Sequence, residues 1–192
     1  MTGDIDYGPL AGLIGVWRGD SGTDVAPEPD GAETSPFFET ITFSTVDDVV
    51  TNAEAQDLVA VQYHQVVSRK STGRVFHDES GYWMWDAAAA TVMHALVIPR
   101  AVGVLAGGAY NGETDAEGRV VLEVAARLGD PDWGIVQSPF MRDHARTTEF
   151  RHRLAFGGGT LAYAETTIVE IYGKTFEHTD ESVLTLKPAA AG

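Results

Sequence analysis

The chain contains no cysteine among its 192 residues. This absence excludes disulfides, thiolate metal sites, a thiol nucleophile and covalent attachment of a cofactor through paired cysteines. The chain also lacks any apolar run close to the roughly 18 residues of a membrane span, and no signal-peptide pattern opens it. We therefore expect a globular protein of the reducing cytoplasm, with no membrane as a partner.

Basic residues are scarce, with 13 Lys and Arg against 28 Asp and Glu and a formal charge of −15. This charge repels phosphate backbones, so we expect no nucleic acid as a partner. The chain also lacks a Walker P-loop, a G-x-G-x-x-G after a strand, a G-x-S-x-G elbow and an H-E-x-x-H helix. Its six histidines are scattered over different segments, and the sequence alone does not gather them into a zinc site.

Long helical periods are missing, and the chain consists of short segments rich in Val, Ile, Thr, Phe and Tyr, separated by 21 glycines and 8 prolines. The expected strands are Phe38–Ser44, Val59–Arg69, Ser80–Asp86, Thr91–Ile98, Val102–Ala106, Arg119–Ala126, Thr147–Phe156, Thr160–Tyr172 and Val183–Lys187. Their even spacing, with glycine-containing turns between them, favours an antiparallel meander. Closing such a sheet into a barrel removes its exposed edges. We predict an all-β fold with one domain over residues 1–192.

Three segments differ from this pattern. Pro9–Gly22 predicts one short helical turn that leads through Gly15 and Trp17 into a strand. Trp17 could plug one end of a barrel or be an ordinary core residue, and spacing does not separate these options. Ser21–Pro36 is acidic and rich in Pro and Gly, which favours a solvated loop over a functional lid. Gly129–Ala145 is irregular but carries apolar residues, so we expect it to fold back over another part of the chain.

A histidine lies within the apolar period of the last expected strand. Alternate residues of a strand share a face, and counting back by twos from Leu186 and Leu184 reaches His178. An inward histidine needs partners, because an unsatisfied buried polar group costs about 1 to 3 kcal/mol. From the residues alone, a satisfied core histidine is favoured over a ligand-binding one.

Five blocks of sequence, in this order, carry a family resemblance. They are LAGLIGVWRGDSG (Leu10–Gly22), FFETITFS (Phe37–Ser44), GRVFHDESGYW (Gly73–Trp83), LVIPRAVGVLAGG (Leu96–Gly108) and the late His178. Together they resemble the nitrobindin family of haem-binding β-barrels over most of the chain, and the H-x-E-S-G-Y-W pattern is the most distinctive part. The resemblance implies a calycin-like antiparallel barrel of roughly ten strands, similar to fatty-acid-binding proteins and lipocalins, with a short N-terminal helical turn.

The resemblance also implies one b-type haem per chain, held non-covalently. His178 matches the proximal iron ligand of the family, which makes it the expected metal-binding and catalytic residue. Phe76 and His77 match a pair that lines the family's cavity, and Ile168 falls where the family also lines its pocket. These residues, with Arg100, form the expected cofactor site.

Two of these positions keep alternatives open. His77 could face the distal side of the haem, or it could only hydrogen-bond Glu79 and Ser80. Arg100 stands where the family tends to have Gln or His. It could pair with a haem propionate or an anionic substrate, or it could be a solvated charge on the rim of the barrel.

The function implied by the resemblance is that of a haem-dependent enzyme that binds nitric oxide and related nitrogen oxide species and isomerises peroxynitrite to nitrate. A first alternative is a barrel that carries an apolar small ligand without haem. A second alternative is a barrel filled by side chains that serves as an interaction module. The oligomeric state stays open, with a homodimer as one option.

Overall fold

The computed structural model of the protein describes residues 5–46 and 48–188, so the predicted domain of residues 1–192 extends beyond the described part. It contains a 3-10 helix, η1 (Gly8–Leu13), and an α-helix, α1 (Pro139–His144). The strands are β1 (Gly15–Glu28), β2 (Gly31–Thr45), β3 (Val50–Asn52), β4 (Gln56–Arg69), β5 (Val75–Asp86), β6 (Thr91–Ile98), β7 (Val102–Ala109), β8 (Val120–Arg127), β9 (Ile135–Gln137), β10 (Ala145–Gly157), β11 (Thr160–Ile171) and β12 (Lys174–Leu186).

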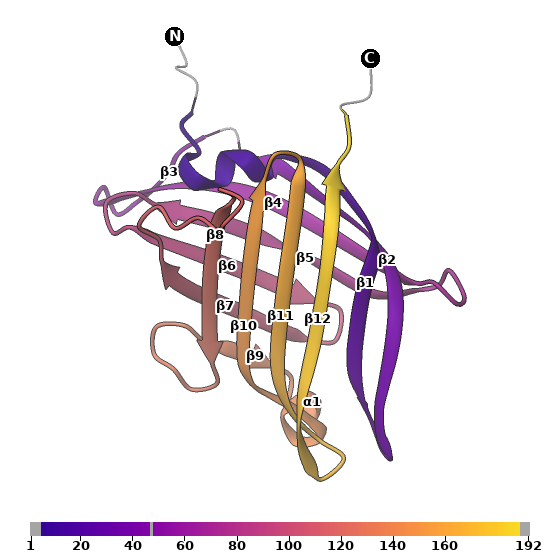
Figure 1. The fold of residues 1–192 in the computed structure, drawn as a ribbon. Coiled ribbons are helices and arrows are strands. Elements are labelled where there is room, and N and C mark those ends of the chain that lie inside the picture. Colours follow the sequence, from indigo (N-terminus) through magenta and orange to yellow (C-terminus); the bar gives the residue numbers. More distant parts are fainter. Residues whose placement is uncertain (1–4, 47, 189–192) are drawn as a thin grey trace.

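Ten of the strands close into an antiparallel barrel (Figure 1). Around the wall they follow the order β2, β1, β12, β11, β10, β8, β7, β6, β5 and β4, and pairing of β2 with β4 closes the ring. Closure pairs the edge strands that an open sheet would expose. The prediction of an all-β, calycin-like barrel of roughly ten strands with a short N-terminal helical turn is confirmed.

The 3-10 helix covers one end of the barrel, and α1 lies at the opposite end (Figure 1). Leu10 and Leu13 on η1 are fully buried, and so is Trp17 at the start of β1. The indole N–H of Trp17 donates to the backbone oxygen of Leu13 at 2.7 Å, which ties the strand to the turn before it. Trp17 is therefore a core residue at the covered end of the barrel.

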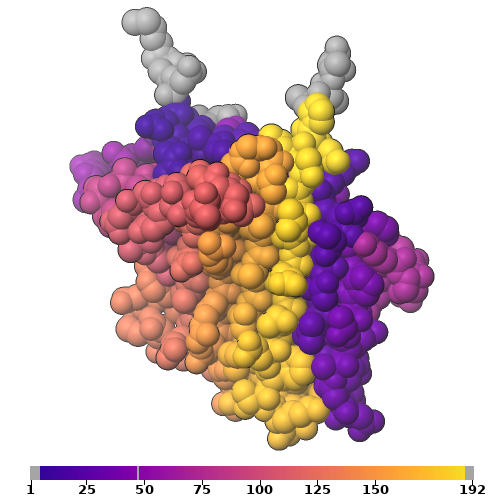
Figure 2. Space-filling model, in the orientation of Figure 1, coloured from indigo at the N-terminus to yellow at the C-terminus, as the bar shows by residue number. Residues whose placement is uncertain are grey.

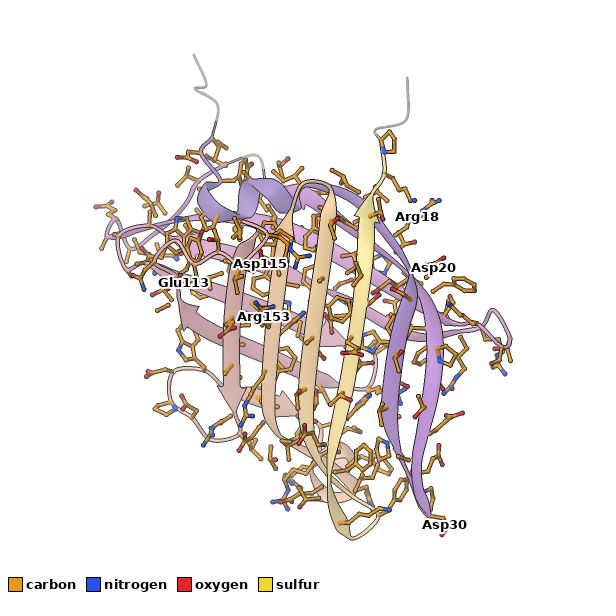
Figure 3. The ribbon with its side chains drawn as sticks, in the orientation of Figure 1. Arg18, Asp20, Asp30, Glu113, Asp115 and Arg153 are labelled. Carbon is orange, nitrogen blue, oxygen red and sulfur yellow. The ribbon has the colours of Figure 1, made fainter. Side chains whose placement is uncertain are left out.

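The prediction of a solvated loop over Ser21–Pro36 is wrong, because this segment is the distal half of the β1–β2 hairpin. The turn lies at Pro29 and Asp30, and Figure 3 shows Asp30 at its tip. Proline is tolerated near the end of a hairpin, where fewer ladder hydrogen bonds are required. The pairing shifts register near Gly22, which lies against the ring of Phe37 so closely that a Cβ would come within 1.9 Å of it.

The wall between β7 and β8 is held by a single residue pair, Gly107 with Ala125. Beside this seam, the short β9 pairs with β7, and α1 follows it in the chain. The ring of Trp133 packs against Gly107 so closely that a Cβ at this position would lie 2.3 Å from the ring. The segment Gly129–Ala145 thus folds back onto the wall, as its apolar residues predicted.

The last strand is longer than predicted, since β12 begins at Lys174 rather than Val183. Its inward face carries Leu184 and Ser182, both buried. The alternation that favoured an inward His178 therefore continues along the whole strand. In the described part of the chain, no helix is both long and apolar enough to cross a membrane.

Candidate functional site

A cavity of about 380 Å³ lies inside the barrel, within the size range of small-molecule sites. Residues at its mouth come from the β1–β2 hairpin (Ala26), from α1 (Met141) and from the β11–β12 turn (Tyr172). These elements lie at the end of the barrel opposite η1 (Figure 1). On the face seen in Figure 2, β10, β11, β12 and β1 form a continuous surface, so the cavity has a closed wall on this side.

His178 lies on β12, and its side chain lines the cavity. Its Nε2 lies 2.7 Å from Oδ1 of Asp24 and 3.3 Å from Oδ2 of Asp180. The Asp24 side chain is only 3% exposed, whereas that of His178 is 30% exposed. His178 is therefore a histidine with acidic partners that also borders the open space of the cavity.

Three carboxylates, which we call the acidic row, face one another across adjacent strands. Asp24 on β1 is directly opposite Asp180 on β12, and Asp180 is directly opposite Glu165 on β11. His152 on β10 is the next residue, opposite Glu165, with a ring nitrogen 3.3 Å from its carboxylate. Like charges directly opposite each other destabilise a sheet, so bound protons or a cation are needed to offset the repulsion within the acidic row.

Burial and mutual repulsion raise pKa values around the acidic row. Burial raises the pKa of Asp180 to about 7, opposed by the charge of His178 and helped by that of Asp24. Burial likewise raises the pKa of Glu165 well above its ordinary value, and the charges of Glu79 and Asp180 add to the effect. Burial acts to lower the pKa of His178, but the contact with Asp24 and the charge of Asp180 outweigh it, and the net shift is upward.

Phe76 and His77 are neighbours in the chain, yet both line the cavity. In a regular strand they would face opposite sides of the sheet. The pairing of β4 with β5 shifts register at this point, and the resulting bulge turns both side chains inward. The ring of Phe76 packs edge-on against Phe37 at 6.3 Å, and the guanidinium of Arg69 lies 4.7 Å from its centroid.

A buried hydrogen-bond network begins at His77. Its Nε2 lies 3.5 Å from Oε2 of Glu79, and Glu79 also accepts a hydrogen bond from the hydroxyl of Tyr63. Tyr63 has one hydroxyl proton, so the 2.7 Å contact of its oxygen with Nε2 of His94 requires His94 to donate. Burial places the pKa of His94 well below its ordinary value, which keeps this ring neutral. His77 thus contacts Glu79 and also borders the cavity.

Arg100 is exposed and belongs to the cavity lining. One of its guanidinium nitrogens lies 3.5 Å from the backbone oxygen of Phe76. Within the described residues it forms no ion pair. Its charge is therefore available to an anionic group entering the cavity.

The prediction that Ile168 lines the pocket is wrong. On β11 the cavity-lining residues are the odd-numbered ones, which include Thr167 and Val169. Strand alternation turns Ile168 to the other face of the sheet. The residues that the structure brings together at the cavity are therefore Phe76, His77, Arg100 and His178.

The acidic side of the cavity was not among the features predicted from the sequence. Strand alternation from the buried Leu161 and Tyr163 would have placed Glu165 inward, so that signal was present. Asp24 had no comparable signal, because it lies in a segment that was predicted to be a loop. Its position beside His178 depends on the pairing of two strands that are far apart in the sequence.

Comparison with protein families matches residues 6–185 to the THAP4-like, heme-binding beta-barrel domain. The chain belongs to this family. The resemblance to nitrobindins is thereby confirmed. Among solved structures, the crystal structure of Rv2717c from M. tuberculosis is similar, with a TM-score of 0.69 and 20% identity over 95% of this chain and 100% of that one. At this identity the likeness supports the fold alone. No curated protein matches the chain.

The residue types at the cavity fit the haem that the heme-binding barrel family implies. His178 offers an imidazole on the wall, and Phe76, Met141 and Val169 are among the apolar residues that could pack on a porphyrin. Metal-bound imidazoles commonly donate their other ring N–H to a carboxylate, and Asp24 is placed as such a partner. The acidic row is the feature of this cavity that a haem alone does not explain.

Proposed function

We propose that the protein binds one b-type haem non-covalently through His178 and isomerises peroxynitrite to nitrate, with nitric oxide and related nitrogen oxides as further ligands. The observation that carries the proposal is a cavity whose wall combines the imidazole of His178, on the last strand, with apolar residues, in a chain of the heme-binding barrel family. When bound, haem iron supplies the redox-active centre for this chemistry. The proposal places this activity in the cytoplasm and in a single domain spanning residues 1–192.

The residues around the cavity would contribute binding and orientation. Asp24 holds the ring of His178 in place through the 2.7 Å contact. Burial acts to lower the pKa of His77, but the contact with Glu79 and its charge outweigh burial and raise the pKa, which favours a protonated ring. A positive His77 together with Arg100 would attract an anion such as peroxynitrite into a cavity that is otherwise acidic.

The direct test is the decay of peroxynitrite and the yield of nitrate with the haem-loaded protein, followed by stopped-flow absorbance. We expect decay to accelerate with protein concentration and the nitrate yield to rise. The His178→Ala variant should lose this effect. The matched control is His64→Ala, since His64 pairs with Asp78 and its side chain is 52% exposed.

A haem-loaded protein that leaves the peroxynitrite decay unchanged would contradict the isomerase part of the proposal. An unchanged rate in the His178→Ala variant, with normal activity in the wild type, would remove His178 from its role. The His64→Ala control shows whether loss of any histidine is enough to alter the rate.

A carrier of a small ligand without haem is the second candidate, favoured by the open mouth and the apolar part of the cavity wall. The acidic row disfavours a fatty acid, because its carboxylate would meet Asp180 and Glu165. Native mass spectrometry of the purified protein separates the two candidates. A bound organic mass without any capacity for haem would favour the carrier.

A further inference from the structure

We propose that the haem-free protein binds a divalent transition-metal ion of the zinc type through Asp24, His178 and Asp180. This site goes beyond haem binding, since the acidic partners that complete it have no role as iron ligands in the proposed function. The ion would sit at the wall of the cavity, between β1 and β12.

The three ligand atoms converge in the structure as a metal site requires. One carboxylate oxygen of Asp24, one ring nitrogen of His178 and one carboxylate oxygen of Asp180 all lie within 4.8 Å of one another. The two contacts of Nε2 are 2.7 Å and 3.3 Å. Around a four-coordinate ion with bonds of about 2.1 Å, ligand atoms lie about 3.4 Å apart. Small side-chain movements therefore suffice to place an ion among them.

The ligands are held by two paired strands rather than by loops. Asp24 and Asp180 are directly opposite each other in the β1–β12 ladder, and His178 is two residues from Asp180 on the same face of β12. The Asp24 side chain is 3% exposed, whereas those of His178 and Asp180 are 30% and 25% exposed toward the cavity. The site is thus anchored on one side and open on the other, where an ion can enter and water can complete its coordination.

The charges around the site favour a cation. Glu165 lies directly opposite Asp180 on β11 and adds a third carboxylate to the wall. Directly opposed like charges are destabilising, and a bound dication offsets this repulsion. The positive groups that line the same cavity are Arg69, Arg100 and the ring of His77, and Arg69 is paired with Glu33. The acidic side chains of the lining outnumber these groups.

The ligand set selects the class of ion. One imidazole nitrogen with two carboxylate oxygens suits zinc and its neighbours among the transition metals. Magnesium and calcium favour sites made of oxygen atoms. We therefore expect zinc and cobalt(II) to bind in preference to magnesium.

The test is isothermal titration calorimetry of the haem-free protein with zinc, with magnesium as a second titrant. We expect one zinc per chain and much weaker binding of magnesium. Asp24→Asn and Asp180→Asn should each weaken zinc binding by more than about tenfold. The matched controls also replace an acid by its amide, at exposed positions of the same strands. They are Asp20→Asn on β1 (Figure 3) and Glu181→Gln on β12, and both should leave zinc binding unchanged.

Circular dichroism checks that each variant folds. If Asp24→Asn fails to fold, the zinc affinity of Asp180→Asn decides the test. Equal zinc affinity in Asp180→Asn and Glu181→Gln would overturn the proposal, and so would a wild-type protein that binds no zinc. Haem titration of Asp180→Asn separates this proposal from the proposed function. Loss of zinc binding with haem binding retained in Asp180→Asn supports the site, whereas a wild-type protein that binds haem but not zinc refutes the zinc site alone.

Discussion

Among single residues, the histidines of this barrel differ in the direction in which the fold shifts their pKa values. His94 and His152 are buried in the core, where His94 stacks on the ring of Trp83 at 4.2 Å. Burial lowers the pKa of both rings. His178 and His77 border the cavity, where neighbouring carboxylates outweigh burial and raise their pKa values. The local partners of each ring, rather than burial alone, decide its charge.

The buried His152 makes the stability of the protein depend on pH. Its pKa falls from 6.5 in the unfolded chain to about 4 in the fold, because burial disfavours the charged ring. Between these values the unfolded chain binds more protons, so the free energy of unfolding falls as the pH falls from 6.5 to about 4. The loss due to this ring approaches about 3 kcal/mol. In the His152→Gln variant, urea unfolding should show a smaller loss over this range.

The control for this change is His64→Gln at an exposed position, which should keep the pH dependence of the wild type. A His152→Gln variant whose unfolding free energy falls as steeply with acid as that of the wild type would contradict the assignment. Any further slope that the variant retains is expected to come from other buried groups, such as His94.

At the scale of elements, β5 and β6 approach each other closely at Gly81. A Cβ there would lie 2.0 Å from the backbone oxygen of Ala95 and 2.9 Å from the ring of Tyr63. Gly81→Ala should therefore lower the free energy of unfolding by about 1 to 3 kcal/mol, the usual cost of overpacking. Denaturant unfolding measures the change. Gly31→Ala is the control, because a Cβ at Gly31 meets no atom within 4 Å; equal stability of the two variants would contradict the close approach.

Most strands could be predicted from the sequence because their residues alternate between a buried and an exposed face. The bounds of β6, Thr91–Ile98, agree with the prediction, and alternation also identified His178 as inward. The distal half of the β1–β2 hairpin was not predicted, because its Gly and Pro residues resemble those of a loop and only the pairing with neighbouring strands holds it as a strand. The site contact of Asp24 with His178 depends on that hairpin, so no local pattern could indicate it.

In the molecule as a whole, the two ends of the barrel differ in how their interior is filled. The end under η1 is filled by side chains, among them Leu10, Leu13 and Trp17. The other end holds the cavity, and the acidic row and His178 line it. The closed end stabilises the fold, and the open end provides space for a ligand. This division supports a barrel that binds a cofactor rather than one filled throughout by side chains.

The proposed function requires haem iron to bind His178 inside this cavity. Titration of the protein with haemin, followed by the Soret band of the absorption spectrum, tests this requirement. We predict a shifted Soret band that saturates at one haem per chain, the same band in His64→Ala, and loss of this band in His178→Ala. A spectrum that is identical in the wild type and in His178→Ala, or a wild-type protein that does not shift the Soret band at all, would contradict the claim.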